Sequence, residues 1–187
     1  LDKAGIEVKI LDTIAEDPSF RAEGDAKQYG MSPGAIKEYV STYRPDIVGV
    51  TNPFTTQVDN ARSVCAMVKE ASPATPVLVG GPHVTVNARD FLESTAGADI
   101  VVRGEGEYAM LDVVRHFQGS GQELQEIPGL AFRKGDEVLF TEARPAISDL
   151  DALPLPAYHL IDMEKYLGRH SKIRYRMSRY KREIPMI

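Results

Sequence analysis

The chain has 187 residues, of which 43% are hydrophobic, 26% charged and 7% aromatic, a balance typical of globular proteins rather than disordered, collagenous or membrane ones. Its 27 acidic and 22 basic residues give a formal net charge of −5, which argues against a general nucleic-acid-binding protein. Cys65 is the only cysteine. The chain therefore forms no internal disulfide and supplies too few thiolates for a four-cysteine zinc site or a 4Fe-4S cluster.

No apolar run approaches the roughly 20 residues that a membrane-spanning helix needs, and the chain opens without a basic and then apolar leader. We therefore expect a cytoplasmic protein with no membrane partner. One segment departs from the acidic balance, because residues 169–182, RHSKIRYRMSRYKR, are strongly basic. We interpret this segment as a solvated linker, or as a strand whose partner domain is missing, and expect no nucleic-acid partner.

The opening residues 1–5, LDKAG, look like the last turn of a helix that ends in a capping glycine. A helix that begins in its last turn lacks its body, so we expect a fragment whose first strand is missing. Residues 6–11 alternate between apolar and polar side chains and predict a strand. After a polar loop, Ser32-Pro33 is typical of a helix start, and an apolar stripe continues that helix to Tyr43.

Strand and helix patterns alternate along the middle of the chain. Continuous apolar runs predict buried strands at 47–50, 76–79 and 99–102. Apolar stripes with helical spacing predict helices at 57–71 and 88–95 and in a segment that ends near 117. Such alternation implies right-handed crossovers and a parallel sheet covered on both faces. The predicted fold is a doubly wound, Rossmann-like α/β domain.

The end of the chain changes character. Residues 129–133 and 137–140 flank Lys134-Gly135-Asp136 and predict a β-hairpin beyond the alternating units. The proline-punctuated stretch 153–159 is expected to be extended, and a short helix is expected from about 162 to 167.

Three loops follow predicted strands, and ligands of open parallel sheets bind outside the carboxyl ends of the strands. These loops offer hydroxyl and amide groups, glycine backbone that a ligand can approach closely, and charge. The candidate binding residues are Thr51, Asn52, Pro53, Phe54 and Thr55 in the first loop, Gly80, Gly81, Pro82, His83, Val84 and Thr85 in the second, and Arg103, Gly104 and Glu105 in the third.

Each candidate also has a purely structural interpretation. Gly80-Gly81-Pro82 can be a sharp turn and nothing more. His83 lacks an obvious second histidine or cysteine nearby with which to hold a metal ion. Glu105 and Glu107 could form an acid–base pair, but Glu107 also suits the first turn of a helix, where the helix dipole favours negative charge. We assign no catalytic residue and no metal ligand.

Several short sequence motifs together resemble those of a known family: VGVT, VLVGGPHVT, ADIVVRGEGE, IPGLAFR and ISDLDALPLPAYHLIDMEKY. They are similar to the amino-terminal cobalamin-binding domain and linker of B12-dependent radical S-adenosylmethionine (SAM) enzymes. This family includes methyltransferases and the anaerobic magnesium-protoporphyrin IX monomethyl ester cyclase, an iron–sulfur oxidoreductase. The resemblance implies a cobalamin-binding domain at 1–147 and a linker at 148–187 toward a radical SAM domain that this chain lacks.

The resemblance also implies that the corrin ring lies across the carboxyl edge of the sheet and contacts the three loops. Many B12-binding domains supply a histidine to cobalt from an Asp-x-His-x-x-Gly loop, which this chain lacks, so we expect base-off cobalamin without a histidine ligand. The chain also lacks the family's Cys-x3-Cys-x-x-Cys motif, so SAM and the 4Fe-4S cluster are expected only in the missing domain. The chain alone is then a binding module, and catalysis belongs to a larger parent enzyme.

Two other interpretations stay open. A flavodoxin-like or receiver-like module would bind a flavin or a protein partner at the same edge of the sheet. A phosphoreceiver needs a cluster of acidic residues at the strand ends, and Asp12 is the only candidate there. A degenerate domain that has lost its ligand would keep the fold and have a purely structural role.

Overall fold

The computed structural model describes residues 1–23 and 26–168. The chain divides into two compact units, one formed by Lys37–Leu153 with Leu1, the other by Asp2–Ile36 with the segment from Pro154 onward. The basic segment predicted to be a linker lies outside the described residues. Within the described part, no helix has the length and apolar character needed to span a bilayer. The domain boundary at 147 stays a prediction.

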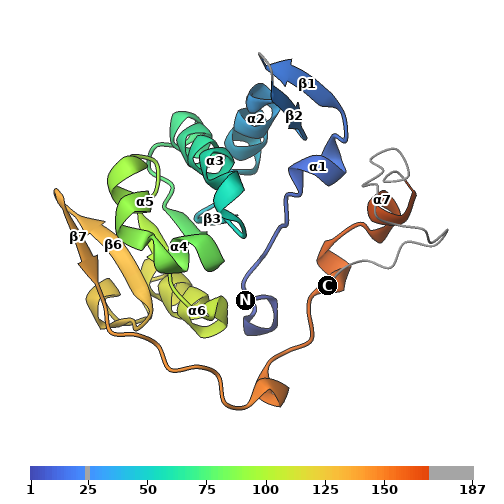
Figure 1. Ribbon diagram of the computed structural model, residues 1–187. Helices are drawn as coiled ribbons and strands as arrows, with labels where there is room; N and C mark the ends of the chain where they lie inside the picture. Colours follow the sequence, from blue (N-terminus) through green and yellow to red (C-terminus); the bar gives the residue numbers. More distant parts are fainter. Residues whose placement is uncertain (24–25, 169–187) are drawn as a thin grey trace. The chain divides into compact units, whose positions relative to one another are not determined.

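A five-stranded sheet forms the centre of the first unit, with the strand order β3-β4-β5-β6-β7 (Figure 1). The strands are β3 (Val48–Thr51), β4 (Val77–Gly80), β5 (Ile100–Val102), β6 (Leu130–Lys134) and β7 (Glu137–Phe140). The first three are parallel, and β6 and β7 continue the sheet in antiparallel pairing.

The α/β fold is confirmed, but the sheet is mixed rather than wholly parallel. The predicted hairpin is present, yet it joins the main sheet instead of lying beyond it, because β6 pairs directly with β5. Its residues Leu130, Ala131 and Phe132 are all buried. A strand that is buried on both faces must pair inside a covered sheet, and β5 offers the free edge.

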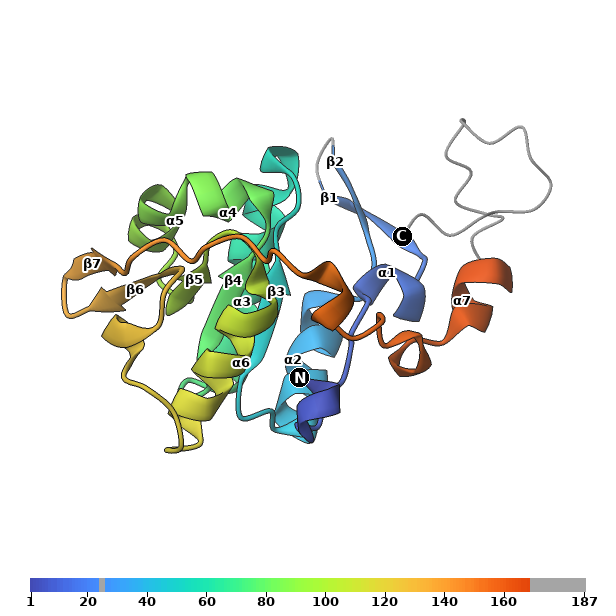
Figure 2. The same ribbon diagram turned by 90° about the horizontal axis from the view of Figure 1, so that it is seen from below.

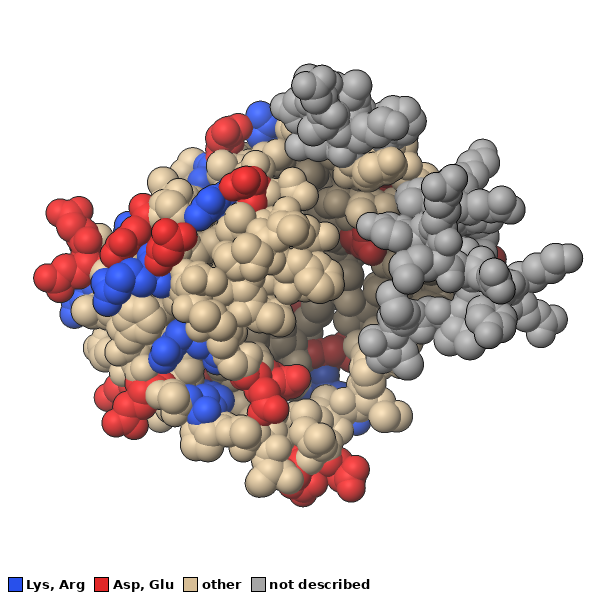
Figure 3. All heavy atoms as spheres, viewed as in Figure 1, with Lys and Arg blue, Asp and Glu red and all other residues tan. Residues whose placement is uncertain are grey.

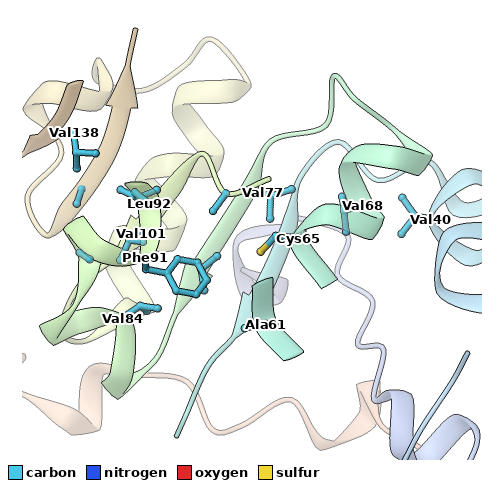
Figure 4. Packing of buried hydrophobic residues seen from close by; sticks show 14 residues of the cluster. Val40, Ala61, Cys65, Val68, Val77, Val84, Phe91, Leu92, Val101 and Val138 are labelled. Carbon is cyan, nitrogen blue, oxygen red and sulfur yellow. The ribbon is translucent and has the colours of Figure 1, made fainter. Parts of the chain in front are cut away.

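Helices cover both faces of this sheet, and α5 and α6 lie on opposite sides of it (Figure 2). The helices are α2 (Pro33–Tyr43), α3 (Val58–Ala71), α4 (Pro82–Val86), α5 (Ala88–Ser94) and α6 (Gly106–Phe117). One hydrophobic cluster joins α3 and α5 to the strands, with the Phe91 ring surrounded by aliphatic side chains (Figure 4). A second cluster joins α6 to the other face.

Local signals set the ends of α2 as the sequence predicts. Ser32 Oγ accepts a hydrogen bond from the backbone N–H of Ala35 at 3.1 Å, which caps the first turn. At the other end, Arg44 has a positive φ of 52°, and Pro45 follows it, so the helix cannot continue. The loop predicted at 80–85 is only partly a loop, because Pro82 begins the short helix α4.

In the second unit, the strand predicted near the beginning of the chain is absent. Residues 6–11 form no strand, although their side chains alternate. Alternation describes a side-chain pattern, whereas a strand also needs a neighbouring strand with which to pair. The expected polar loop instead contains α1 (Thr13–Glu16) and a hairpin of β1 (Phe20–Glu23) and β2 (Ala26–Tyr29). The predicted short helix near the end is confirmed as α7 (Met163–Gly168).

Among the described residues, five short 3-10 turns connect these elements: Asp2–Ala4, Thr55–Gln57, Leu124–Glu126, Leu150–Ala152 and Tyr158–Leu160. The first turn ends at Gly5, which has a positive φ of 75°, as the opening sequence predicts.

Asp12 has a structural role in the second unit. Its Oδ1 accepts hydrogen bonds from the backbone N–H groups of Ile14 and Ala15, both at 3.0 Å, and caps α1. The Tyr166 hydroxyl donates to Asp12 Oδ2 at 2.7 Å. Burial and this hydrogen bond raise the pKa of Tyr166 to about 12. The carboxylate considered for a phosphoreceiver therefore ties α1 to α7 instead.

The thiol of Cys65 gives a prediction about pH. Cys65 is fully buried on α3, and desolvation raises the pKa of its thiol to about 12 from 9.0. Between pH 9 and about pH 12 the thiol loses its proton in the unfolded chain but keeps it in the folded chain. The unfolding free energy therefore falls as the pH rises through this range. We expect the unfolding free energy of the wild type, measured relative to that of Cys65→Ala, to fall by about 1.4 kcal/mol per pH unit above pH 9.

Denaturant unfolding of both proteins at pH 7 and pH 10 measures this difference. At pH 8 in the absence of denaturant, the thiol should also resist a disulfide exchange reagent, because it is buried and protonated. A difference that is the same at both pH values would contradict the assignment of a neutral, buried thiol.

Candidate functional site

Asn52 lies directly after β3, at the carboxyl edge of the parallel strands. Its backbone N–H donates to the Gly80 carbonyl at 2.8 Å, and its side-chain Nδ2 donates to the Phe54 carbonyl at 2.9 Å. The residue is 0% exposed, and Oδ1 has no hydrogen-bond partner among the described residues. Because Nδ2 is held by Phe54, the amide cannot turn to satisfy Oδ1 without losing that bond. A buried acceptor without a donor is costly and is often a sign of a missing ligand or water.

Gly81 follows β4 and packs directly against Asn52. Its φ is 118°, a conformation that side chains rarely adopt, and a Cβ placed there would lie 2.6 Å from the Asn52 carbonyl oxygen. Gly80, one position earlier, has no atom within 4 Å of the place where its Cβ would lie. The two glycines therefore have different roles: Gly81 permits the close approach of two loops, and Gly80 leaves open space at the end of β4.

Side-chain hydrogen bonds connect all three predicted loops. His83 Nδ1 lies 3.0 Å from Thr55 Oγ1, which joins the β4 loop to the β3 loop. Thr85 Oγ1 donates to the Gly81 carbonyl at 3.0 Å and accepts from the Gly104 backbone N–H at 3.1 Å, which joins the β4 loop to the β5 loop. The structure thus brings the three loops together at one edge, as predicted.

The surface at this edge carries exposed apolar side chains. Phe54 is 63% exposed and Val86, at the end of α4, is 82% exposed. Figure 3 shows mostly uncharged residues around the end of β3 and the start of α4, with charged residues gathered mainly around them. Gly104, with a φ of 75°, has open space where a Cβ would lie. This edge suits a ligand that is largely uncharged and has apolar surface.

The other predicted residues of the first two loops differ in how far they are accessible. Thr51 and Pro82 are exposed, and Pro53 is half-buried. Val84 is fully buried in the core beside Phe91, so its side chain is used for packing (Figure 4). A contact between a ligand and Val84 would have to use the backbone.

The side chains of Arg103 and Glu105 bind to the end of the hairpin and to the segment after it. Arg103 donates to the Thr141 carbonyl at 2.8 Å, and its guanidinium lies 5.1 Å from the centre of the Phe140 ring. Glu105 accepts a hydrogen bond from the backbone N–H of Ile147 at 2.6 Å. In this structure both side chains stabilise the hairpin and the segment that follows it.

The segment after β7 was not predicted to lie near the site. It passes the start of α6 and forms a cavity with Tyr108, lined by Tyr108, Arg144, Pro145, Ala146, Ile147, Ser148, Asp149 and Ala152. An ion pair between Arg144 and Asp112 holds it, in addition to Glu105. Nothing in the sequence pattern indicates these contacts, because they join residues that are 32 and 42 positions apart.

Two other histidines of the described residues, His116 and His159, have partners of their own. His116 Nδ1 lies 2.9 Å from the Gln122 carbonyl at the far end of α6, and His159 Nε2 lies 3.3 Å from an Asp2 carboxylate oxygen in the second unit. In the part of the chain that the structure describes, no group of three or more His, Cys, Asp or Glu side chains could hold a metal ion.

Comparisons with known proteins agree on one family. A family model described as a B12 binding domain matches residues 1–114. An uncharacterised methyltransferase of Pyrococcus horikoshii is 33% identical over 160 residues, which are 86% of this chain and 32% of that protein. The cytidylyl-2-hydroxyethylphosphonate methyltransferase of Streptomyces wedmorensis is 30% identical over 191 residues, covering 89% of this chain and 35% of that protein. The chain thus spans about a third of the length of these curated relatives.

A solved structure supports the same fold. The cobalamin-dependent SAM radical enzyme OxsB, with aqua-cobalamin and SAM bound, superposes with a TM-score of 0.54. Sequence identity is 20%, and the match covers 63% of this chain and 16% of that chain. At this identity the likeness concerns the fold.

Proposed function

The chain belongs to the B12-binding domain family, and from this premise we propose that the three linked loops form its cobalamin-binding edge. It resembles the B12-binding domains of cobalamin-dependent radical SAM methyltransferases, and its cofactor is cobalamin. The proposal concerns which residues hold the cofactor. The observation that carries it is the set of hydrogen bonds by which His83 and Thr85 join the three loops at one edge, with open space at Gly80 and Gly104.

The residues at this edge fit a corrinoid. A corrin ring is broad, carries apolar methyl groups, and has carboxamide side chains that donate and accept hydrogen bonds. Phe54 and Val86 offer exposed apolar surface for the ring periphery. Gly80 and Gly104 leave room for close approach to the backbone.

The three loops would then bind the cobalamin and fix its orientation. The short helix α4 and the loops from β3 and β5 are fixed to one another by Thr85 and His83, so little has to be ordered when the cofactor binds. Bound cobalamin supplies the methyl-transfer or radical chemistry, which protein side chains cannot supply. This chain would place the cofactor and exclude water from one of its sides.

We further propose a parent protein that is a radical SAM methyltransferase or oxidoreductase. The relatives that support this proposal are about three times as long as the chain, and they are named as methyltransferases and a cyclase. SAM and the 4Fe-4S cluster would be bound by a radical SAM domain of the same polypeptide. The cytoplasmic location stays a prediction from the sequence.

The direct test mixes the purified 187-residue chain with hydroxocobalamin, removes unbound cofactor by desalting, and records the visible spectrum of the protein fraction. We expect retained corrinoid with the spectrum of the base-off form. Protein that emerges without corrinoid, from this chain and also from a longer form that includes the following domain, would overturn the proposal. Protein that is purified yellow would favour the flavin-binding alternative.

A further inference from the structure

The hydrogen bond between His83 and Thr55 leaves one atom of the histidine unused. Thr55 is the first residue of the 3-10 turn after β3, and His83 is the second residue of α4. Their side chains meet at Nδ1 and Oγ1, 3.0 Å apart. The other ring nitrogen, Nε2, has no hydrogen-bond partner among the described residues, and the side chain is only half-buried. The ring is therefore held at one nitrogen and open at the other.

We propose that His83 Nε2 donates a hydrogen bond to an oxygen atom at the periphery of the corrinoid, and that Thr55 orients the ring for this role. This inference rests on the proposed function. When the Thr55 hydroxyl donates to Nδ1, the single proton of the neutral ring stands on Nε2, which becomes a donor. Two corrinoid oxygens accept such a bond, a carboxamide carbonyl of the ring and a phosphodiester oxygen of the nucleotide tail.

The partner of Nδ1 favours this role over coordination of cobalt. A histidine that ligates a metal usually donates its second ring N–H to a carboxylate or a backbone carbonyl, which makes the ligating nitrogen more basic. Thr55 offers a neutral hydroxyl instead. A hydroxyl that donates to Nδ1 withdraws electron density from the ring, and the ring proton then occupies Nε2 and blocks it as a ligand.

Two substitutions of His83 separate its two nitrogens. His83→Gln places an amide near the position of Nε2 and keeps the outer donor, whereas His83→Asn places an amide near Nδ1 and keeps only the group that faces Thr55. We expect His83→Asn to weaken hydroxocobalamin binding about tenfold, the typical effect of one lost hydrogen bond, and His83→Gln to stay within about threefold of the wild type. Equal affinities for the two variants would overturn the proposal.

The role of Thr55 is tested by two further variants. Thr55→Val keeps the shape of the side chain and removes the hydroxyl, so the ring loses its orienting partner, and we expect weaker binding of hydroxocobalamin. Thr55→Ser keeps the hydroxyl and should restore most of the affinity. His116→Asn, at the far end of α6, is the matched control and should leave the affinity unchanged.

Cobinamide, which lacks the nucleotide tail, identifies the acceptor. If His83→Asn weakens cobalamin binding but not cobinamide binding, the acceptor is the phosphodiester; if it weakens both, the acceptor is a ring carboxamide. Either result supports the proposal, and affinities unchanged for both corrinoids overturn it.

Electron paramagnetic resonance of the bound Co(II) corrinoid separates donation from coordination. We expect the wild type and His83→Asn to give the same spectrum. A nitrogen coupling that is present in the wild type and lost in His83→Asn would show that His83 ligates cobalt, and would overturn the proposal. A wild-type chain that binds neither corrinoid, alone or joined to its following domain, would overturn the proposed function and this inference together, whereas normal binding by His83→Asn would overturn only the inference.

Discussion

Replacing Gly81 with leucine is expected to abolish corrinoid binding. The new Cβ would lie 2.6 Å from the Asn52 carbonyl oxygen and 2.9 Å from its carbonyl carbon, and the backbone at φ 118° is unfavourable for any residue with a side chain. The β3 and β4 loops must then separate, which displaces both Asn52 and His83. We expect no corrinoid retained after desalting, together with a loss of about 1–3 kcal/mol in unfolding free energy from backbone strain.

Gly80→Leu distinguishes a blocked site from a strained one. No atom lies within 4 Å of a Cβ at Gly80, so the substitution should leave the unfolding free energy nearly unchanged while its side chain fills the proposed ligand space. Gly119→Ala, at a positive φ of 70° beyond α6, is the control for backbone strain away from the edge and should bind normally. Normal cobalamin binding by both Gly80→Leu and Gly81→Leu would show that the cofactor lies elsewhere.

Replacing Phe91 with alanine is expected to have the largest effect on stability. Phe91 is 0% exposed and lies in the cluster that joins α3 and α5 to the sheet (Figure 4). The guanidinium of Arg62 also lies 5.8 Å from the centre of its ring. Removing a buried ring loses its burial and leaves a cavity, which together cost about 3–5 kcal/mol. Denaturant unfolding measures this loss.

Phe117 provides the matched control. It is also a phenylalanine on a helix, but it is 42% exposed at the end of α6. Phe117→Ala should change the unfolding free energy by less than about 1 kcal/mol, because little apolar surface leaves the interior. Equal losses for the two variants would contradict the position of Phe91 at the centre of this cluster.

The family, and the meeting of three loops at one edge of the sheet, could be predicted from short motifs and local rules. The three parallel strands are marked by continuous apolar runs, and such runs are readable because a strand buried on both faces tolerates few polar residues. The loops after Thr51, Gly80 and Val102 then meet because parallel strands all end at the same edge. Residue types along the chain are therefore enough to predict these strands and the edge at which their loops meet.

Pairing between distant segments was harder to predict. Residues 6–11 have the alternation of a strand but form none, and β6 joins β5 where only an isolated hairpin was predicted. Both errors have the same cause. Alternation and turn residues describe what one segment can do, whereas the partner of a strand depends on which edge is free elsewhere in the fold.

The strands β3, β4 and β5, the loops that follow them and the family could be predicted from the sequence, because these depend on local patterns of apolar, polar and glycine residues. What each loop residue contacts depends on the tertiary structure. It placed Val84 in the core, directed Arg103 and Glu105 to the hairpin and the segment after it, and left Asn52 Oδ1 without a partner. These outcomes depend on contacts between segments far apart in the chain, and no local pattern records which atoms will meet.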